Sequence, residues 1–197
     1  MSKGKDAKPH IGIFGRRNNG KSSLINAMAG QEIAIVSDFA GTTTDPVKKS
    51  MEIAGLGPVI LIDTAGIDDV GELGQKRIAK TNEVLKTVDL ALLLITSNSF
   101  GKEEINLISS FKNYAVPFLV IHNKSDLDVL DTALKIRIQN EFNAETIDFS
   151  ALKPKNKEQI ILAIQHLMPV TAYRSQSLIG DLISYGDTVL LITPIDI

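Results

Sequence analysis

The sequence predicts an α/β fold with a mostly parallel, doubly wound sheet. Three observations lead to it: short apolar runs of four to six residues, helical patterns between these runs, and a regular alternation of the two. Near-continuous apolar runs are typical of strands buried on both faces, and their alternation with helices is typical of parallel sheets. The 197 residues are enough for one such domain with a short extension, so we expect a single core.

The expected elements follow one another from the N-terminus. Apolar runs predict strands at residues 11–14, 59–62, 90–95, 118–121 and 146–149. Helical patterns predict helices at residues 21–29, about 75–86, 102–114, 127–142 and 156–168.

Further segments flank or interrupt this alternation. Residues 31–45 show no clear period and contain a glycine and three threonines, which predicts a mobile loop, and residues 47–53 are expected to form an edge strand. Residues 1–8 are expected to be a flexible tail, and residues 9–169 form the predicted domain. Residues 170–197 are expected to hold a polar linker and one more apolar strand.

The composition excludes several classes of function. The chain has no cysteine, so these residues hold no disulfide, no catalytic thiol and no thiolate-bound zinc or iron–sulfur cluster. A formal charge of −2 disfavours nucleic acid as the main partner. No stretch approaches the roughly 20 apolar residues of a membrane span, and no signal peptide is recognisable. We therefore expect a cytoplasmic protein with no membrane partner.

Residues 15–22 match the P-loop pattern Gly-x4-Gly-Lys-Ser between a predicted strand and a predicted helix. The two glycines allow the backbone N–H groups to surround a β-phosphate. Lys21 can reach the β- and γ-phosphates, and the Ser22 hydroxyl can coordinate Mg²⁺. The simpler alternative is a glycine-rich turn before an ordinary helix. The expected nucleotide contacts here are Gly15, Asn18, Asn19, Gly20, Lys21, Ser22 and Ser23.

A second motif, Asp63-Thr-Ala-Gly66, closes the predicted strand at residues 59–62. Because the carboxyl ends of parallel strands meet at one edge of a sheet, Asp63 is expected beside the P-loop. There its carboxylate can hold Mg²⁺, and the Gly66 N–H can bind the γ-phosphate.

A third motif, Asn123-Lys-Ser-Asp126, predicts the base. The Asp126 carboxylate can accept from guanine N1–H and the N2 amino group, whereas adenine presents an acceptor at N1 and has no N2 amino group. The nucleotide is therefore expected to be GTP or GDP. The remaining contacts are expected from Asn123, which would brace the loops, Lys124 over the base, and the segment Ser150, Ala151 and Leu152.

These motifs in this order resemble the translation-factor-related GTPases, and residues 41–45 resemble the switch I signature of their TrmE and Era branch. The resemblance implies a P-loop NTPase with a Ras-like G domain that hydrolyses GTP to GDP and phosphate. It gives catalytic roles to Lys21, Thr43 and Gly66, and it makes Thr43 the switch threonine that binds Mg²⁺ and the γ-phosphate. The neighbours Thr42 and Thr44 remain alternatives.

The same resemblance implies slow hydrolysis. Ile67 stands where Ras-like proteins carry a water-orienting glutamine. In TrmE-like members K⁺ supplies positive charge and is held partly by a P-loop asparagine, which corresponds to Asn18; a loop-capping amide is the alternative. Glu72 is expected to be a solvated side chain rather than a water-orienting carboxylate. Arg16 and Arg17 are expected to face solvent or an effector rather than to act as an arginine finger.

A narrower resemblance rests on residues 15–26, 40–47 and 180–196, which are similar to the iron–iron hydrogenase maturation GTPases, the HydF family. It implies a conformational switch in hydrogenase cluster maturation, the maturation proteins as partners, and a homodimer. Residues 170–197 would then be a linker and the truncated start of a dimerisation domain. A GTPase of tRNA modification or ribosome assembly is one alternative, and a GTP-binding interaction module with incidental hydrolysis is another.

Overall fold

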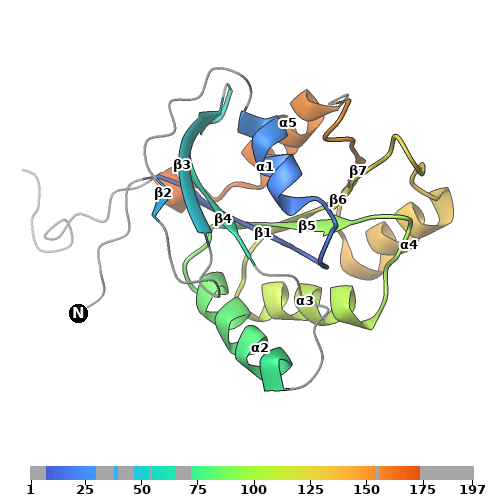
Figure 1. The fold of residues 1–197 in the computed structure, drawn as a ribbon, viewed down its shortest axis with the longest axis horizontal. Helices are drawn as coiled ribbons and strands as arrows, with labels where there is room; N and C mark the ends of the chain where they lie inside the picture. The colour runs from blue at the N-terminus through green and yellow to red at the C-terminus, as the bar shows by residue number, and fades with distance from the viewer. Residues whose placement is uncertain are drawn as a thin grey trace, which may run out of the picture.

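The chain is described from a computed structural model, which covers residues 8–29, 38–39, 47–53, 55–64, 72–153 and 156–173. Within these residues one seven-stranded sheet has the strand order β2-β3-β4-β1-β5-β6-β7. Strands β4, β1, β5, β6 and β7 run parallel, and β2 and β3 are antiparallel to their neighbours. Helices cover both faces of the sheet (Figure 1). The predicted α/β, mostly parallel, doubly wound architecture is confirmed.

The elements alternate along the chain as the sequence predicts. The strands are β1 (His10–Gly15), β2 (Asp38–Phe39), β3 (Val47–Ile53), β4 (Gly57–Asp63), β5 (Leu90–Ile95), β6 (Phe118–His122) and β7 (Thr146–Asp148). The helices are α1 (Lys21–Ala29), α2 (Glu72–Leu85), α3 (Lys102–Asn113), α4 (Thr132–Phe142) and α5 (Lys157–Leu167), followed by the 3-10 turn η1 (Val170–Tyr173).

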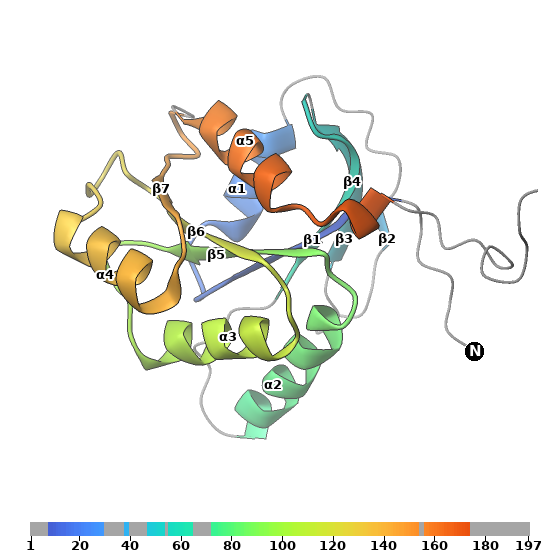
Figure 2. The same ribbon diagram turned by 180° about the vertical axis from the view of Figure 1, so that it is seen from behind.

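The sheet separates two halves of the hydrophobic core. Helices α1 and α5 lie on one face, and α2, α3 and α4 lie on the other, which the reverse view also shows (Figure 2). Side chains of β1 alternate between the halves, so Ile13 packs on the α1 side and Phe14 on the α3 side. The Phe14 ring lies 5.1 Å from that of Phe111 on α3. Burying an aromatic side chain of this kind stabilises the fold by about 1.5–3 kcal/mol.

Helix α4 begins five residues later than the sequence predicts. Apolar residues continue the helical pattern backwards to Leu127, but Leu127 and Val129 are 78% and 71% exposed and lie in the non-helical segment before α4. Asp131 caps the helix because its carboxylate accepts from the Ala133 N–H at 2.9 Å. Capping therefore sets this boundary rather than apolar periodicity.

Two other expectations also need correction. The predicted edge strand β3 is not the outermost strand, because β2 pairs with its Lys48 and Lys49. Residues 170–173, assigned to the polar linker, form η1, and Ala172 is only 4% exposed within the core. Residues 1–7 of the predicted tail (1–8), most of the loop 31–45 and the segment 174–197 lie outside the described residues. None of the described helices is long and apolar enough for a bilayer.

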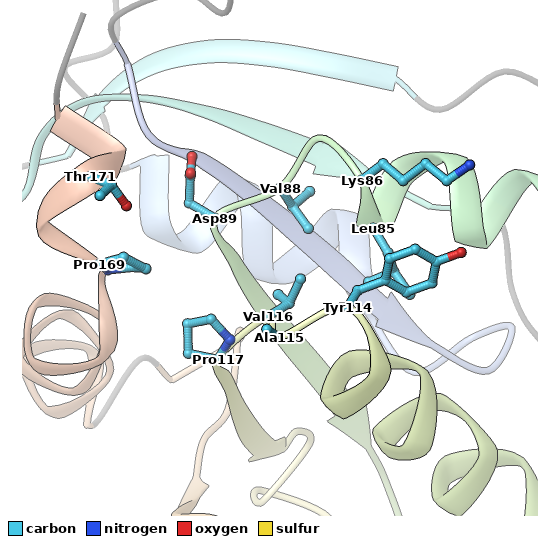
Figure 3. Close-up of a pocket in the computed structure, with 10 residues that line it drawn as sticks. All are labelled: Leu85, Lys86, Val88, Asp89, Tyr114, Ala115, Val116, Pro117, Pro169 and Thr171. Carbon is cyan, nitrogen blue, oxygen red and sulfur yellow. The ribbon is translucent and has the colours of Figure 1, made fainter. Parts of the chain in front are cut away.

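A cavity of about 400 Å³ opens at the amino ends of β5 and β6 (Figure 3). Asp89 and Pro117, which directly precede these strands, line it together with Pro169 and Thr171 from the C-terminal part of the chain. The predicted motifs follow the opposite, carboxyl ends of the strands. The cavity is therefore separate from the site described next.

Candidate nucleotide-binding site

The predicted motifs meet at the carboxyl edge of the sheet. The P-loop follows β1, Asp63 ends β4, Asn123 follows β6, and Ser150 comes shortly after β7. These strands are parallel members of one sheet, so their carboxyl ends share one edge. Ligands of open α/β sheets bind in crevices at this edge.

The two P-loop glycines are required by close approach as well as by backbone conformation. Gly15 has φ +145° and Gly20 has φ +82°, both in the region that favours glycine. A Cβ at Gly15 would lie 2.5 Å from the Leu94 carbonyl oxygen, and a Cβ at Gly20 would lie 2.4 Å from Asn123 Nδ2. The loop can therefore take this curved path only with glycine at both positions.

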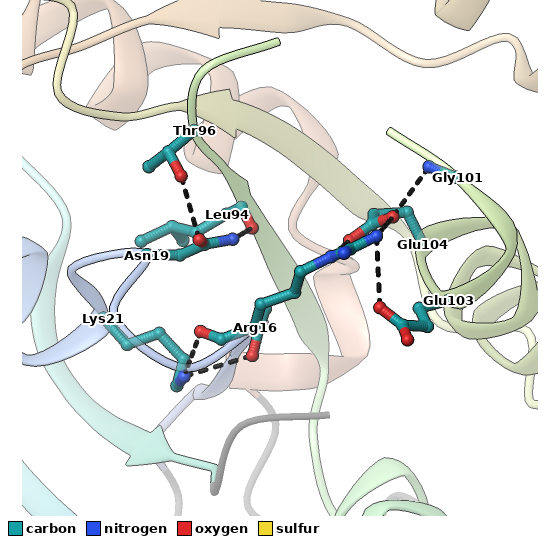
Figure 4. A network of polar contacts seen from close by, with 9 residues as sticks. Arg16, Asn19, Lys21, Leu94, Thr96, Gly101, Glu103 and Glu104 are labelled. Atoms are coloured by element: carbon teal, nitrogen blue, oxygen red, sulfur yellow. Dashed lines mark hydrogen bonds and ion pairs between the residues drawn. The ribbon is translucent and has the colours of Figure 1, made fainter. Parts of the chain in front are cut away.

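Lys21 extends back over its own loop. Its Nζ donates to the carbonyl oxygens of Gly15 at 3.1 Å and Arg16 at 2.9 Å (Figure 4). The ammonium group is thus held beside the N-terminus of α1, where the helix dipole and the free N–H groups favour an anion. Binding of the β- and γ-phosphates by Lys21 stays a prediction, with which this position of the ammonium group agrees.

Ser22 and Asp63 come from different elements and meet at the site. The Ser22 hydroxyl donates to Asp63 Oδ2 at 2.8 Å. Mg²⁺ prefers oxygen ligands, and this hydroxyl and carboxylate lie next to each other, so the two residues fit the predicted metal. When bound there, Mg²⁺ would neutralise phosphate charge. Thr43, Gly66 and Ile67 lie outside the described residues, and the side chain of Glu72 does as well.

The Asn19 side chain points beneath the P-loop, and a nucleotide contact through the main chain of Asn19 stays a prediction. Its side chain is buried, its Nδ2 donates to the Leu94 carbonyl at 2.8 Å, and its Oδ1 accepts from the Thr96 hydroxyl at 2.9 Å. Leu94 lies at the carboxyl end of β5 and Thr96 directly follows this strand. The Asn19 side chain therefore braces the P-loop, while the neighbouring Asn18 and Ser23 are exposed.

The predicted guanine residues are also brought together. The Asn123 side chain is buried and its Nδ2 donates to the Asn19 carbonyl at 2.9 Å, which confirms that Asn123 braces the loops. The Ser150 hydroxyl donates to Asp126 Oδ1 at 2.5 Å, joining the loop after β6 to the loop after β7. Asp126 itself is exposed, as a base-binding carboxylate must be before the base arrives.

The other guanine-loop residues lie around this pair. Lys124 and Ala151 are half-buried, and Lys124 has φ +62°. Leu152 is 83% exposed, so its side chain packs against little of the protein.

His122, at the end of β6, has a structural role. The ring is fully buried, Nδ1 lies 2.7 Å from Asp148 Oδ1, and Nε2 accepts from the Asn98 N–H at 3.4 Å. One imidazole thus links the ends of β5, β6 and β7 directly behind Asn123.

Sequence reasoning missed the partner of Arg16. The guanidinium was expected to face solvent or an effector, but it pairs with Glu104 on α3, with Nε–Oε1 at 2.7 Å and Nη2–Oε2 at 2.8 Å (Figure 4). The one available signal was the position of Glu104 three residues after Gly101, the spacing of a capping box. That signal predicts the helix start but not the arginine 88 residues away.

A P-loop between a strand and a helix, a carboxylate at the end of the neighbouring strand, and an Asn-Lys-x-Asp loop together define a P-loop GTPase. A family model described as "50S ribosome-binding GTPase" matches residues 10–124, more than half of the chain. The chain therefore belongs to this family of GTPases, whose reaction is the hydrolysis of GTP to GDP and phosphate.

Similar curated proteins are GTPases as well. The tRNA modification GTPase MnmE of Nitrosomonas europaea is 38% identical over 153 residues, which are 77% of this chain and 33% of MnmE. MnmE of Bacillus licheniformis is 34% identical over 178 residues, 89% of this chain and 37% of that protein. GTPase Der of Wolinella succinogenes is 40% identical over 121 residues, which are 59% of this chain and 26% of Der. The chain thus spans about a third of the length of its MnmE relatives.

Solved structures show the same fold. Aquifex aeolicus Era bound to GDP and AlF4⁻ superposes with a TM-score of 0.66 at 26% identity, over 81% of this chain and 56% of Era. The G domain of T. maritima FeoB has a TM-score of 0.60 at 18% identity, over 81% of this chain and 98% of that domain. The resemblance to the TrmE and Era branch is confirmed. The narrower assignment to the hydrogenase maturation GTPases finds no support among these relatives.

Proposed function

We propose that this chain is the G domain of a GTP-dependent conformational switch that acts in tRNA modification. The observation that carries the proposal is the 38% identity to a tRNA modification GTPase over 77% of the chain. The site supports the nucleotide part of it, because Lys21 lies over the P-loop and the Ser22 hydroxyl meets the Asp63 carboxylate, an arrangement that suits a Mg²⁺–nucleotide. This alternative is now better supported than hydrogenase maturation, the first expectation from the sequence.

Hydrogenase cluster maturation is a second candidate, because residues 40–47 and 180–196 are similar to the HydF family. On this proposal the chain forms a homodimer through its C-terminal extension and acts with the hydrogenase maturation proteins. Apart from Val47, the first residue of β3, both stretches lie outside the described residues, so this candidate rests on the sequence alone.

The two processes can be distinguished by the molecules that the immobilised full-length protein binds. We would immobilise it in the GTP-bound and GDP-bound states and add purified tRNA to one set and the hydrogenase maturation proteins to another. Nucleotide-dependent retention of tRNA supports the first proposal, and retention of the maturation proteins supports the second. Retention of neither, with self-association that depends on GTP, would favour an interaction module instead.

We further propose that K⁺ stimulates hydrolysis. Asn18 supports this, because it is an exposed residue of the P-loop and its amide oxygen is a ligand that a monovalent cation accepts. The turnover of GTP should be faster in KCl than in NaCl of equal ionic strength, and Asn18→Ala should reduce that difference. Equal rates in the two salts at several protein concentrations would refute the proposal.

A further inference from the structure

A partly buried ion pair ties the P-loop to helix α3. Arg16 follows Gly15, the first glycine of the loop, and its guanidinium reaches the first turn of α3 (Figure 4). Two parallel bonds join it to Glu104, at 2.7 and 2.8 Å, and Nη2 also lies 3.1 Å from Glu103 Oε2. A planar fork of this kind fixes orientation as well as distance.

The geometry of the pair is strongly constrained because Glu104 is fully buried. A buried carboxylate is tolerated only when donors satisfy its oxygens. Besides the two bonds from Arg16, Glu104 Oε2 accepts from the Gly101 N–H at 2.8 Å. The carboxylate is therefore fixed by the N-terminus of α3, and the arginine is fixed by the carboxylate.

The main chain of the same arginine holds the P-loop lysine. The Arg16 carbonyl accepts from Lys21 Nζ at 2.9 Å. A second link, from the Thr96 hydroxyl to Asn19 Oδ1 at 2.9 Å, fixes the loop on the far side of Arg17 and Asn18. Residues 96–104 thus hold the P-loop at two points, one on each side of its exposed crest.

We propose that Arg16 and Glu104 are positioning residues for nucleotide binding. Their ion pair fixes the Arg16 carbonyl and thereby the place from which Lys21 reaches the β-phosphate. Neither side chain is a catalytic residue, and the guanidinium is engaged with α3 rather than directed at the γ-phosphate. The inference concerns the nucleotide site itself and does not depend on the process that the GTPase serves.

The test uses Glu104→Gln in the full chain and compares GDP with GMP, which lacks the β-phosphate that Lys21 binds. Affinities are measured by competition against a fluorescent GDP analogue, together with the binding stoichiometry. The affinity for GDP should fall about tenfold while that for GMP stays unchanged. Equal losses for both nucleotides, or no loss, would overturn the proposal. A lower stoichiometry with unchanged affinities would also overturn it, because the pair would then only stabilise the fold.

A second variant covers the case in which Glu104→Gln does not fold. Arg16→Lys keeps the positive charge beside Glu104 but cannot form the two parallel bonds, and it should also lower the ratio of GDP to GMP affinity. A ratio equal to that of the wild type would refute the proposal. The matched control is Glu141→Gln, which removes the exposed partner of Arg137 on α4, an ion pair of 2.9 Å. If this control lowered the ratio as much, the effect would not belong to the P-loop pair.

Discussion

The phosphate half of the site and the guanine half are held in place by different parts of the polypeptide. The phosphate half is one continuous loop, residues 15–22, shaped by two glycines and braced from below by β5 and α3. The guanine half is assembled from the loops after β5, β6 and β7, which single side chains such as Asn98 and Ser150 link to one another.

The difference separates two kinds of recognition. Main-chain N–H groups and Lys21 bind a phosphate chain whatever base it carries. The guanine half is predicted to read the base through Asp126, an exposed carboxylate on a loop held by a few bonds. Substitutions in the first half should therefore weaken all phosphorylated ligands, whereas substitutions in the second half should change which base is bound.

The largest expected effect is that of Lys21→Ala. Loss of the Lys21 ammonium group removes charge-assisted bonds to the β- and γ-phosphates, each worth roughly 1.5–3 kcal/mol. The GTP affinity should therefore fall about 10²- to 10⁴-fold. Calorimetric titration with GTP measures it. Lys135→Ala, which removes an exposed lysine from α4, is the control and should bind GTP normally. A Lys21→Ala variant with wild-type affinity would mean that the loop binds no phosphate.

Asp126→Asn should have the next largest effect. The GTP affinity should fall about a hundredfold, because two bonds to a charged acceptor are lost, and xanthosine triphosphate should bind better than before. The amide can donate to the xanthine 2-oxo group, which the carboxylate cannot. Competition between GTP and xanthosine triphosphate measures the change in base preference. Asp128→Asn, two residues further on, should leave base preference unchanged; a variant of Asp126 that still prefers GTP would refute the base assignment.

Gly20→Ala tests the junction of the two halves. The new Cβ would meet Asn123 Nδ2 at 2.4 Å, so the P-loop and the guanine loop must separate, and the GDP affinity should fall about tenfold. Gly57→Ala is a matched control, because Gly57 has a similar φ of +84° but nothing within 4 Å of a Cβ. Gly57→Ala should lower the melting temperature and leave the GDP affinity unchanged. Equal effects of both variants on GDP binding would contradict the close contact.

The phosphate half could be predicted almost completely from the sequence, because its determinants lie within eight consecutive residues. The glycine spacing, Lys21 and Ser22 need no long-range information, and helix α1 has the predicted limits. Strands were predicted to within a few residues, since burial on both faces leaves a continuous apolar run. Strand β2 was missed because two residues carry no pattern and only pairing with β3 makes them a strand.

What the sequence could not predict are contacts between distant residues. The bonds of Asn19 to Leu94 and Thr96 span 75 and 77 residues, and nothing local distinguishes a P-loop asparagine that faces the nucleotide from one that faces β5. The start of α4 was wrong for a different reason. Exposed Leu127 and Val129 continue the apolar pattern of a helix, but Asn98 binds the Val129 carbonyl and the Asp131 N–H in a segment that is not helical.

Substitution of Asn98 has the smallest expected effect, and it tests most directly whether the phosphate half and the guanine half are held independently. Its Nδ2 donates to the Val129 carbonyl at 3.0 Å, and its Oδ1 accepts from the Asp131 N–H at 2.8 Å, so it holds the loop that follows Asp126. Asn98 has φ +53°, a conformation that glycine adopts readily, so Asn98→Gly removes the amide without backbone strain.

With these bonds lost, the loop carrying Asp126 is less ordered before guanine binds, and GDP affinity should fall about threefold to fivefold, which corresponds to one neutral hydrogen bond. The ratio of GDP to GMP affinity should stay at the wild-type value, because both nucleotides carry guanine and the contacts of Lys21 are intact. Asn143→Gly, at the left-handed C-cap of α4 with φ +54°, is the control and should leave both affinities unchanged. If Asn98→Gly lowered the ratio as Glu104→Gln is expected to, the guanine loops would also position Lys21, and the two halves would not be held independently.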